Sequence, residues 1–280
     1  MKTIAARSSA ELEDLEVDLL LSAISRRFGY DFRNYSKASI KRRIRRAVQE
    51  LRVATISGLQ EKLLHDPSAL RKFVSTLSVH VTSLFRDPRF YIALRNEVIP
   101  TLRTYPFLRI WVAGCATGEE VYSLAILLSE EGIYDKTQIY ATDISDDVLA
   151  QADLARFPLE RMQLYTQNYQ RALGKRDFSS YYRTQGSFAA LDPALKKNIV
   201  FSQHNLAVDG AFNEFQLILC RNVMIYFDQL LRERVHQLFH NSLCHLGVLG
   251  LGMRESIRFT SITDSYEELN GDYRLYRKVR

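Results

Sequence analysis

The 280-residue chain has few of the residues that cross-link or interrupt a fold, with three cysteines, six prolines and 12 glycines. Cys115, Cys220 and Cys244 show no CxxC spacing, which excludes a disulfide framework and predicts buried, reduced thiols. Scarce glycine also excludes collagen-like chains. No window approaches the roughly 18 apolar residues of a membrane span, and no secretory signal is visible. The composition predicts a cytoplasmic globular protein without membrane insertion.

Most of the chain also has little net charge, because acidic and basic residues nearly balance there. The net charge is +6, yet residues 26–52 hold ten basic and two acidic residues and are +8, which leaves the remainder at −2. An apolar stripe at Ile40, Ile44, Val48 and Leu51 predicts a helix here. The stripe predicts that four arginines project away from it towards solvent or a partner: Arg42, Arg43, Arg45 and Arg46. Such a localised field indicates an acidic partner.

The chain divides into a helical front and an alternating remainder. The first 78 or so residues show apolar positions at helical spacing, whereas short apolar strands and helices alternate from about residue 96. The strand candidates are 109–113, 138–142, 198–202, 216–220, 247–253 and 274–279. This alternation predicts an α/β fold with a doubly wound, mainly parallel sheet, whose ligand sits at the carboxyl ends of the strands. A small inserted antiparallel sheet is expected at about 178–203.

The loop 113–120 follows a strand and opens a helix, but it is neither GxGxxG nor a phosphate-binding P-loop. Glu119 and Glu120 stand in the first helical turn, where carboxylates disfavour a pyrophosphate and favour a cationic ligand. For this pair alone, a dipole-stabilised helix start is an equal explanation. Asp143 ends the next strand, where a carboxylate can accept both ribose hydroxyls of an adenosine. Together these residues favour S-adenosylmethionine, a cation without phosphate.

Polar residues also follow the later strand candidates. Asn205 and Leu206 follow the third strand, where an adenine is expected to lie. The fourth strand is followed by the segment Cys-Arg-Asn-Val-Met-Ile-Tyr-Phe over residues 220–227. Arg221 there is suited to orienting a carboxylate through a bidentate contact.

Four segments carry a resemblance to a known family. They are Val-Thr-Ser-Leu-Phe-Arg-Asp at 81–87, Ala-Thr-Gly-Glu-Glu-Val-Tyr-Ser at 116–123, Ala-Thr-Asp-Ile at 141–144 and Cys-Arg-Asn-Val-Met-Ile-Tyr-Phe-Asp at 220–228. In order and spacing the sequence resembles the chemotaxis receptor methyltransferases, CheR. The resemblance implies a protein-glutamate O-methyltransferase that uses S-adenosylmethionine, releases S-adenosylhomocysteine and forms glutamyl methyl esters on chemoreceptors. It also implies a Rossmann-like methyltransferase domain with a small antiparallel β-subdomain, preceded by an all-helical N-terminal domain.

The resemblance implies domain limits and roles for individual residues. The expected parts are a receptor-recognition domain at 1–78, a linker at 79–95 that contributes to the cofactor site, and the catalytic domain at 96–280. It places Arg221 and Tyr226 close to the transferred methyl group. Arg42, Arg43, Arg45 and Arg46 are expected to face the receptor's methylation helices. The implied cofactor contacts are His80, Thr82, Arg86, Gly114, one of Glu119 and Glu120, Asp143, Asn205, Leu206, Arg221 and Asn222.

Several alternatives remain at this point. A nucleic-acid methyltransferase would use the arginine helix on phosphates, but amino-methylating and cytosine-C5 motifs are missing around Cys220. A non-catalytic module that senses the cofactor is the second alternative. His236 and His240 do not form an HExxH zinc motif, so we expect a solvated helix face and no metal. The segment 181–201 has Gly186 as its only glycine, so no binding of a receptor pentapeptide is expected. The chain is expected to be a monomer.

Overall fold

The computed structural model describes residues 9–77 and 82–280, and these form two compact units. The helical unit comprises Met1–Val79 together with Tyr226–Arg232, and the sheet unit comprises His80–Ile225 together with Glu233–Arg280. The short segment Tyr226–Arg232, which lies far along the chain, belongs with the helices.

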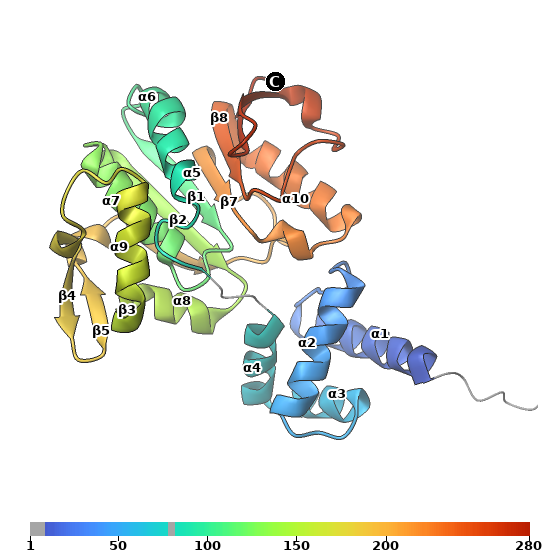
Figure 1. The fold of residues 1–280 in the computed structure, drawn as a ribbon. Helices are drawn as coiled ribbons and strands as arrows, with labels where there is room; N and C mark the ends of the chain where they lie inside the picture. Colours follow the sequence, from blue (N-terminus) through green and yellow to red (C-terminus); the bar gives the residue numbers. More distant parts are fainter. Residues whose placement is uncertain (1–8, 78–81) are drawn as a thin grey trace, which may run out of the picture. The chain divides into compact units, whose positions relative to one another are not determined.

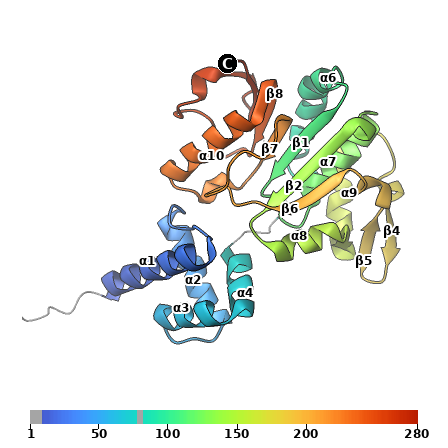
Figure 2. The same cartoon turned by 180° about the vertical axis from the view of Figure 1, so that it is seen from behind.

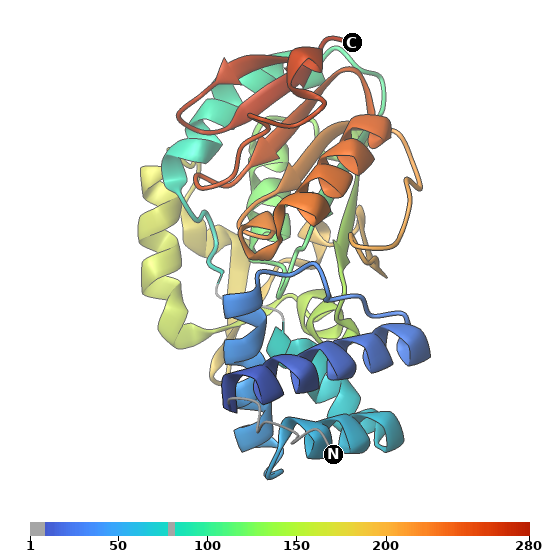
Figure 3. The same cartoon turned by 90° about the vertical axis from the view of Figure 1, so that its right-hand side faces the viewer.

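The helical unit contains α1 (Ser9–Phe28), α2 (Lys37–Glu50), α3 (Ile56–His65) and α4 (Pro67–Leu77), seen from the side in Figure 3. Side-chain caps fix where α3 and α4 begin. The Thr55 hydroxyl accepts a hydrogen bond from Gly58 N, and an Asp66 carboxylate oxygen accepts from Ser68 N and Ala69 N. Such caps satisfy backbone N–H groups that the first helical turn leaves without partners.

The basic helix α2 lies beside acidic residues of α1. Arg45 Nε donates to Glu13 Oε1 at 2.6 Å, and Lys41 forms an ion pair with Asp14. Arg46 pairs within α2 with Glu50, at 2.6 Å. Glu13 and Asp14 lie outside residues 26–52. They therefore balance part of the +8 charge of that segment inside the same unit.

A seven-stranded sheet in the order β6-β2-β1-β7-β8-β10-β9 forms the centre of the sheet unit. Its strands run parallel except β10, which is antiparallel to both neighbours. The central strands β1 and β7 are buried on both faces over most of their length, which is typical of a covered parallel sheet. The strands are β1 (Leu108–Ala113), β2 (Thr137–Asp143), β6 (Ile199–Gln203), β7 (Phe215–Cys220), β8 (Leu243–Leu251), β9 (Tyr266–Asn270) and β10 (Leu275–Lys278).

Helices cover both faces of this sheet. Alternate residues of β1 separate the two layers: Ile110 and Val112 join the core beneath α7, whereas the Trp111 ring lies 5.3 Å from that of Phe239 on α10. Figure 1 shows α7 and α9 on one face, and Figure 2 shows α10 on the other. The helices are α5 (Pro88–Ala93), the π-helical turn η1 (Leu94–Val98), α6 (Ile99–Leu102), α7 (Glu119–Glu130), α8 (Asp146–Asp153), α9 (Met162–Arg171) and α10 (Gln229–Ser242).

The small antiparallel sheet has other members than the predicted range 178–203 suggests. It contains β3 (Arg156–Pro158), β5 (Phe188–Leu191) and β4 (Tyr182–Gln185), in that order. It therefore begins well before residue 178, and α9 lies between its first two strands in the chain. Residues 199–203 instead form β6 of the main sheet, paired with β2.

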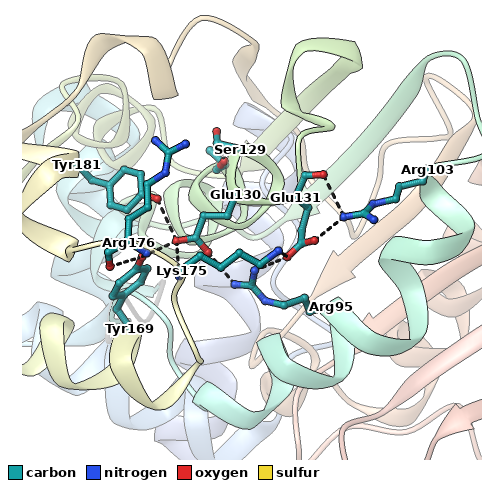
Figure 4. A network of polar contacts seen from close by, with 10 residues as sticks. Arg95, Arg103, Ser129, Glu130, Glu131, Tyr169, Lys175, Arg176 and Tyr181 are labelled. Carbon is teal, nitrogen blue, oxygen red and sulfur yellow. Dashed lines mark hydrogen bonds and ion pairs between the residues drawn. The ribbon is translucent and has the colours of Figure 1, made fainter.

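A buried ionic network holds the C-terminal end of α7 (Figure 4). The Glu130 carboxylate accepts hydrogen bonds from Tyr181 Oη and Lys175 N, each at 3.0 Å, and pairs with Arg95 at 2.9 Å. The Glu131 carboxylate pairs with Arg103 at 2.6 Å and with Lys175 at 2.7 Å. Buried carboxylates this well paired fix the position of α7 at the end opposite to Glu119 and Glu120.

The predicted thiols are confirmed, since Cys115, Cys220 and Cys244 are free and buried. The prediction of a solvated histidine face on α10 is wrong for His236, which is 1% exposed because that face of α10 packs on the sheet. Across residues 9–77 and 82–280, no helix is both long and apolar enough to cross a bilayer.

Candidate active site

The carboxyl ends of β1 and β2 are tied together by backbone hydrogen bonds. Gly114 N and Cys115 N both donate to the Thr142 carbonyl, at 2.8 and 2.9 Å. Asp143 is buried at the end of β2, where Oδ2 accepts from Ala116 N at 3.0 Å and Oδ1 accepts from Ser145 N at 3.1 Å. The two predicted contacts Gly114 and Asp143 therefore lie side by side, with the Asp143 carboxylate fixed by backbone donors.

Gly114 is required by its conformation and by its neighbour. Its φ is +71°, and a Cβ at this position would lie 2.4 Å from Val223 Cγ2. A residue with a side chain would be strained in the left-handed region and would collide with Val223. The loop after β1 is thereby packed directly against the loop after β7.

Glu119 begins α7 and is buried, with 1% of its surface exposed. Its carboxylate accepts hydrogen bonds from Thr117 Oγ1 at 2.6 Å and Tyr165 Oη at 3.2 Å, while Arg161 Nη1 lies 3.9 Å away. Burial raises the pKa of Glu119, against these neighbours, which lower it. Within the part of the chain that the structure describes, the ion pair of Glu119 is this one long contact to Arg161.

Glu120 points to a different partner, Arg221 at the end of β7. Arg221 Nη1 donates to Glu120 Oε1 and Nη2 donates to Asp87 Oδ2, both at 2.8 Å. The guanidinium lies 3.9 Å from the Phe90 ring centroid, and the side chain is 2% exposed. Burial opposes its charge, but Glu120, Tyr91 and Asp87 raise the pKa of Arg221. Arg221 is thus a fully charged, buried cation with two carboxylate partners.

The segment after residue 82 is fixed against the same helices. Phe85 N donates to Ser123 Oγ at 2.8 Å, and the Leu84 carbonyl accepts from Asn168 Nδ2 at 3.0 Å. The Arg86 carbonyl accepts from Arg221 Nη2 at 3.3 Å, which places Arg86 at the site. Thr82 is partly buried two residues before Leu84. His80 lies outside the described residues.

Asn205 and Leu206 are buried where the chain leaves β6. The preceding residue, His204, donates its backbone N–H to the Asp143 carbonyl at 3.0 Å, so this segment lies next to the end of β2. The Asn205 side chain accepts from Ala207 N at 3.0 Å and thereby shapes the turn. This position beside Asp143 fits the predicted adenine-binding role.

Arg43 and Tyr226 lie together in the helical unit. The prediction that Arg43 projects into solvent is wrong, because it is 6% exposed and its guanidinium carbon lies 4.4 Å from the Tyr226 ring centroid. Arg42, Arg45 and Arg46 are exposed. The structure therefore separates the predicted basic surface into three exposed arginines and one buried arginine that packs on the predicted catalytic tyrosine.

Two residues at this site were not predicted. Asp87 was quoted in a motif without a role, yet it binds Arg221. Glu255 follows β8 and accepts backbone hydrogen bonds from the loop that carries Arg221 and Asn222. No spacing in the sequence indicates a role for Glu255, because these partners are backbone groups some thirty residues earlier.

Two family models match this chain. The family model described as "CheR methyltransferase, SAM binding domain" matches residues 80–274, and "CheR methyltransferase, all-alpha domain" matches residues 15–78. The chain belongs to the CheR methyltransferase family. The CheR chain is 48% identical over 265 residues to "Putative methyltransferase Cher3" of Pseudomonas putida, covering 95% of this chain and 97% of that protein. It is 30% identical over 250 residues to a "Chemotaxis protein methyltransferase" of Listeria monocytogenes, covering 88% and 92%.

The cofactor of this CheR methyltransferase is S-adenosylmethionine, and the residues present fit it. A cation suits the acidic start of α7, and the Asp143 carboxylate stands where a ribose is expected. Burial raises the pKa of Cys220 well above its ordinary value, so this residue is a neutral thiol and not a nucleophile. The matches to the methyltransferase family model and to chemotaxis protein methyltransferases do not favour the nucleic-acid and non-catalytic alternatives.

Proposed function

We propose that this CheR methyltransferase methylates glutamate side chains in the cytoplasmic methylation helices of chemoreceptors and forms glutamyl methyl esters. The observation that carries the choice of acceptor is the contact between Arg221 and Asp87. A carboxylate of the chain itself lies 2.8 Å from the buried guanidinium, which supports a carboxylate as the group that this guanidinium orients. The Asp87 side chain is 38% exposed, so it is the more accessible of the two partners of Arg221. Its backbone adopts a left-handed conformation with a φ of 57°.

The reaction needs few groups from the protein. S-adenosylmethionine supplies a methyl group activated by a sulfonium. An acceptor glutamate is ionised at neutral pH and needs no general base. The protein's task is therefore to orient the two reactants and to exclude water from charges that are neutralised during transfer. With the cofactor bound, Arg221 would orient the acceptor carboxylate, Tyr226 would line the path of the methyl group, and Asp143 would hold the ribose hydroxyls.

Glu119 is the better of the two candidate glutamates for the cationic part of the cofactor. The Glu120 carboxylate is already neutralised by Arg221 at 2.8 Å, whereas Arg161 is 3.9 Å from Glu119. A buried carboxylate with weak compensation gains most from a cationic ligand. Thr82, Arg86, Asn205, Leu206 and Asn222 complete the proposed cofactor contacts, together with His80.

Cofactor affinity is expected to fall as pH falls, because burial raises the pKa of Glu119. A raised pKa means that Glu119 becomes neutral at a higher pH than an ordinary glutamate, and its neutral form loses attraction for a cation. The Kd for S-adenosylmethionine, measured by calorimetry from about pH 8 down to about pH 5, should therefore rise as the pH falls. The rise should be steeper than a glutamate of ordinary pKa would produce.

The variant E119Q tests this assignment. It should weaken binding roughly tenfold at the upper end of that pH range and remove most of the pH dependence. E120Q should leave the pH dependence in place. A flat profile in E120Q with an unchanged profile in E119Q would reverse the assignment.

The exposed arginines of α2 are proposed to hold the acidic receptor helix. Charge reversal in R42E should raise KM for the receptor roughly tenfold and make it more sensitive to salt, with the cofactor Kd unchanged. R33E is the matched control, since Arg33 is exposed in the same unit but precedes α2 and pairs with Asp31. Equal losses in R33E and R42E would count against a specific surface on α2.

One labelling experiment tests the proposed function itself. The protein is incubated with methyl-labelled S-adenosylmethionine and either receptor-bearing membranes or nucleic acid. Base-labile label that leaves the receptor as methanol is the expected result, because esters hydrolyse in base. Stable label on nucleic acid, or base-stable label on protein, would overturn the proposal.

A further inference from the structure

We propose that Glu255 is a positioning residue, which holds the loop after β7 in the shape that presents Arg221 and Asn222 to the reactants. It lies four residues beyond the end of β8, and β8 pairs with β7 so that Leu251 is opposite Cys220. The loops that follow these two strands therefore start side by side. The carboxylate is buried within the sheet unit.

Four backbone N–H groups converge on this carboxylate. Oε1 accepts from Val223 N at 2.9 Å and Met224 N at 2.8 Å. Oε2 accepts from Asn222 N at 2.9 Å and Gly252 N at 2.7 Å. Three successive donors from one loop bind a single anion in the manner of a backbone nest, which here is filled by the protein's own side chain.

The loop turns sharply where the anchor binds it. Asn222 has a φ of 63°, in the left-handed region that asparagine adopts more readily than most other residues. Gly252 leaves the space for the carboxylate, since a Cβ there would lie 2.6 Å from Glu255 Oε2 and 2.8 Å from Asn222 N. Glu255 and Gly252 together thus hold Asn222 in its left-handed backbone conformation.

The anchored loop makes two contacts that matter for the reaction. Val223 packs against Gly114 of the cofactor loop, where it leaves no room for a Cβ. Arg221, immediately before the anchored residues, pairs with Glu120 and Asp87. A displacement of this loop would shift the cofactor loop and the proposed acceptor-binding guanidinium together. Glu255 therefore acts on the reaction through Arg221, Asn222 and Gly114 and not by touching a reactant.

The test compares E255Q with E131Q. A glutamine at 255 offers an amide donor where each oxygen now accepts two N–H groups, so one pair of donors loses its acceptor. E131Q is the matched control, because Glu131 is also a buried carboxylate but pairs with Arg103 and Lys175 at the far end of α7 (Figure 4). Each variant is measured for its Tm, for its Kd for S-adenosylhomocysteine, and for kcat and KM of receptor methylation.

E255Q is expected to stay folded, to bind S-adenosylhomocysteine roughly 10- to 100-fold more weakly, and to lose kcat by at least a similar factor. E255D, which keeps the charge, should recover part of both losses. E131Q should lower Tm with little change in Kd or kcat. The kcat readout rests on the proposed function, whereas the Kd readout requires no acceptor, so a failure of one can be told from a failure of the other.

Three results would overturn the proposal. Unchanged Kd and kcat in a folded E255Q would show that the anchor is dispensable. Loss of the folded state in both E255Q and E255D would make Glu255 a structural residue. Similar losses of cofactor affinity in E131Q and E255Q would likewise attribute the effect to general destabilisation.

Discussion

Replacing Arg221 by methionine is expected to lower kcat for methyl transfer by about a hundred- to a thousandfold. The methionine side chain fills much of the same volume but leaves Glu120 and Asp87 without the cation that each contacts at 2.8 Å. Removing one partner from buried ion pairs should also destabilise the fold by about 3 kcal/mol. Initial rates of receptor methylation, measured below the unfolding temperature, separate these two effects.

The chain offers a matched control for Arg221. Arg95 is another largely buried arginine between two carboxylates, Glu130 and Glu131, but it lies at the opposite end of α7 (Figure 4). R95M should lose comparable stability and retain its rate of methyl transfer per folded molecule. If R221M and R95M showed the same rates, the role assigned to Arg221 in orienting the acceptor would fail.

Replacing Asp143 by asparagine is expected to weaken S-adenosylmethionine binding roughly a hundredfold. Each Asp143 oxygen already accepts one backbone N–H, from Ala116 and from Ser145, which fixes the carboxylate at the end of β2. Asparagine has an NH2 group in place of one of these oxygens. That NH2 group would face a backbone N–H, donor against donor, and could no longer accept a hydrogen bond from a ribose hydroxyl. Isothermal titration with S-adenosylhomocysteine measures the loss directly.

Asp66 is the corresponding control for this variant. Its carboxylate also accepts two backbone N–H groups, at the start of α4 in the helical unit. Both N–H groups bind the same oxygen, Oδ1, which asparagine retains, so D66N should keep the helix cap and leave cofactor affinity unchanged. A wild-type Kd in D143N would contradict the assignment of Asp143 to the ribose.

The parts of the fold that were predicted correctly have strong local signals. The strands β1 and β7 are apolar except for their second residues, Arg109 and Gln216, and α7 has the apolar spacing of a helix. The helix α9 and the three-residue strand β3 were not predicted. The sequence of α9 is polar over much of its length, and β3 is too short to show a period, so tertiary pairing determines both.

The exposure of α2 was predicted wrongly for a geometric reason. Arg43 lies three residues after Ile40 and four before Ala47, so all three share the buried face of α2. The spacing was present in the sequence, but the charge of Arg43 favoured assigning it to solvent. Packing against the Tyr226 ring accommodates that charge through a cation–π contact, which no local pattern reveals.

The two glutamates at the start of α7 illustrate what sequence leaves open. Adjacent helical residues point about 100° apart, so one of the pair faces Tyr165 and the other faces Arg221. Which one faces which partner depends on how α7 is rotated against the sheet, and residues distant in sequence set that rotation. Asp87 and Glu255 escaped prediction for the same reason, because their roles arise only from partners that the fold brings together.

Localising the transferred methyl group on the acceptor is the most direct test of the proposal that this protein methylates glutamate side chains of chemoreceptors. Receptor cytoplasmic domain is methylated by the wild-type protein and by R221M, digested, and sequenced by tandem mass spectrometry under acidic conditions that preserve esters. We expect methyl esters on glutamate side chains of the methylation helices, and we expect R221M to leave these glutamates largely unmodified. Methyl groups on lysine, arginine or cysteine, or equal ester formation by R221M, would contradict it.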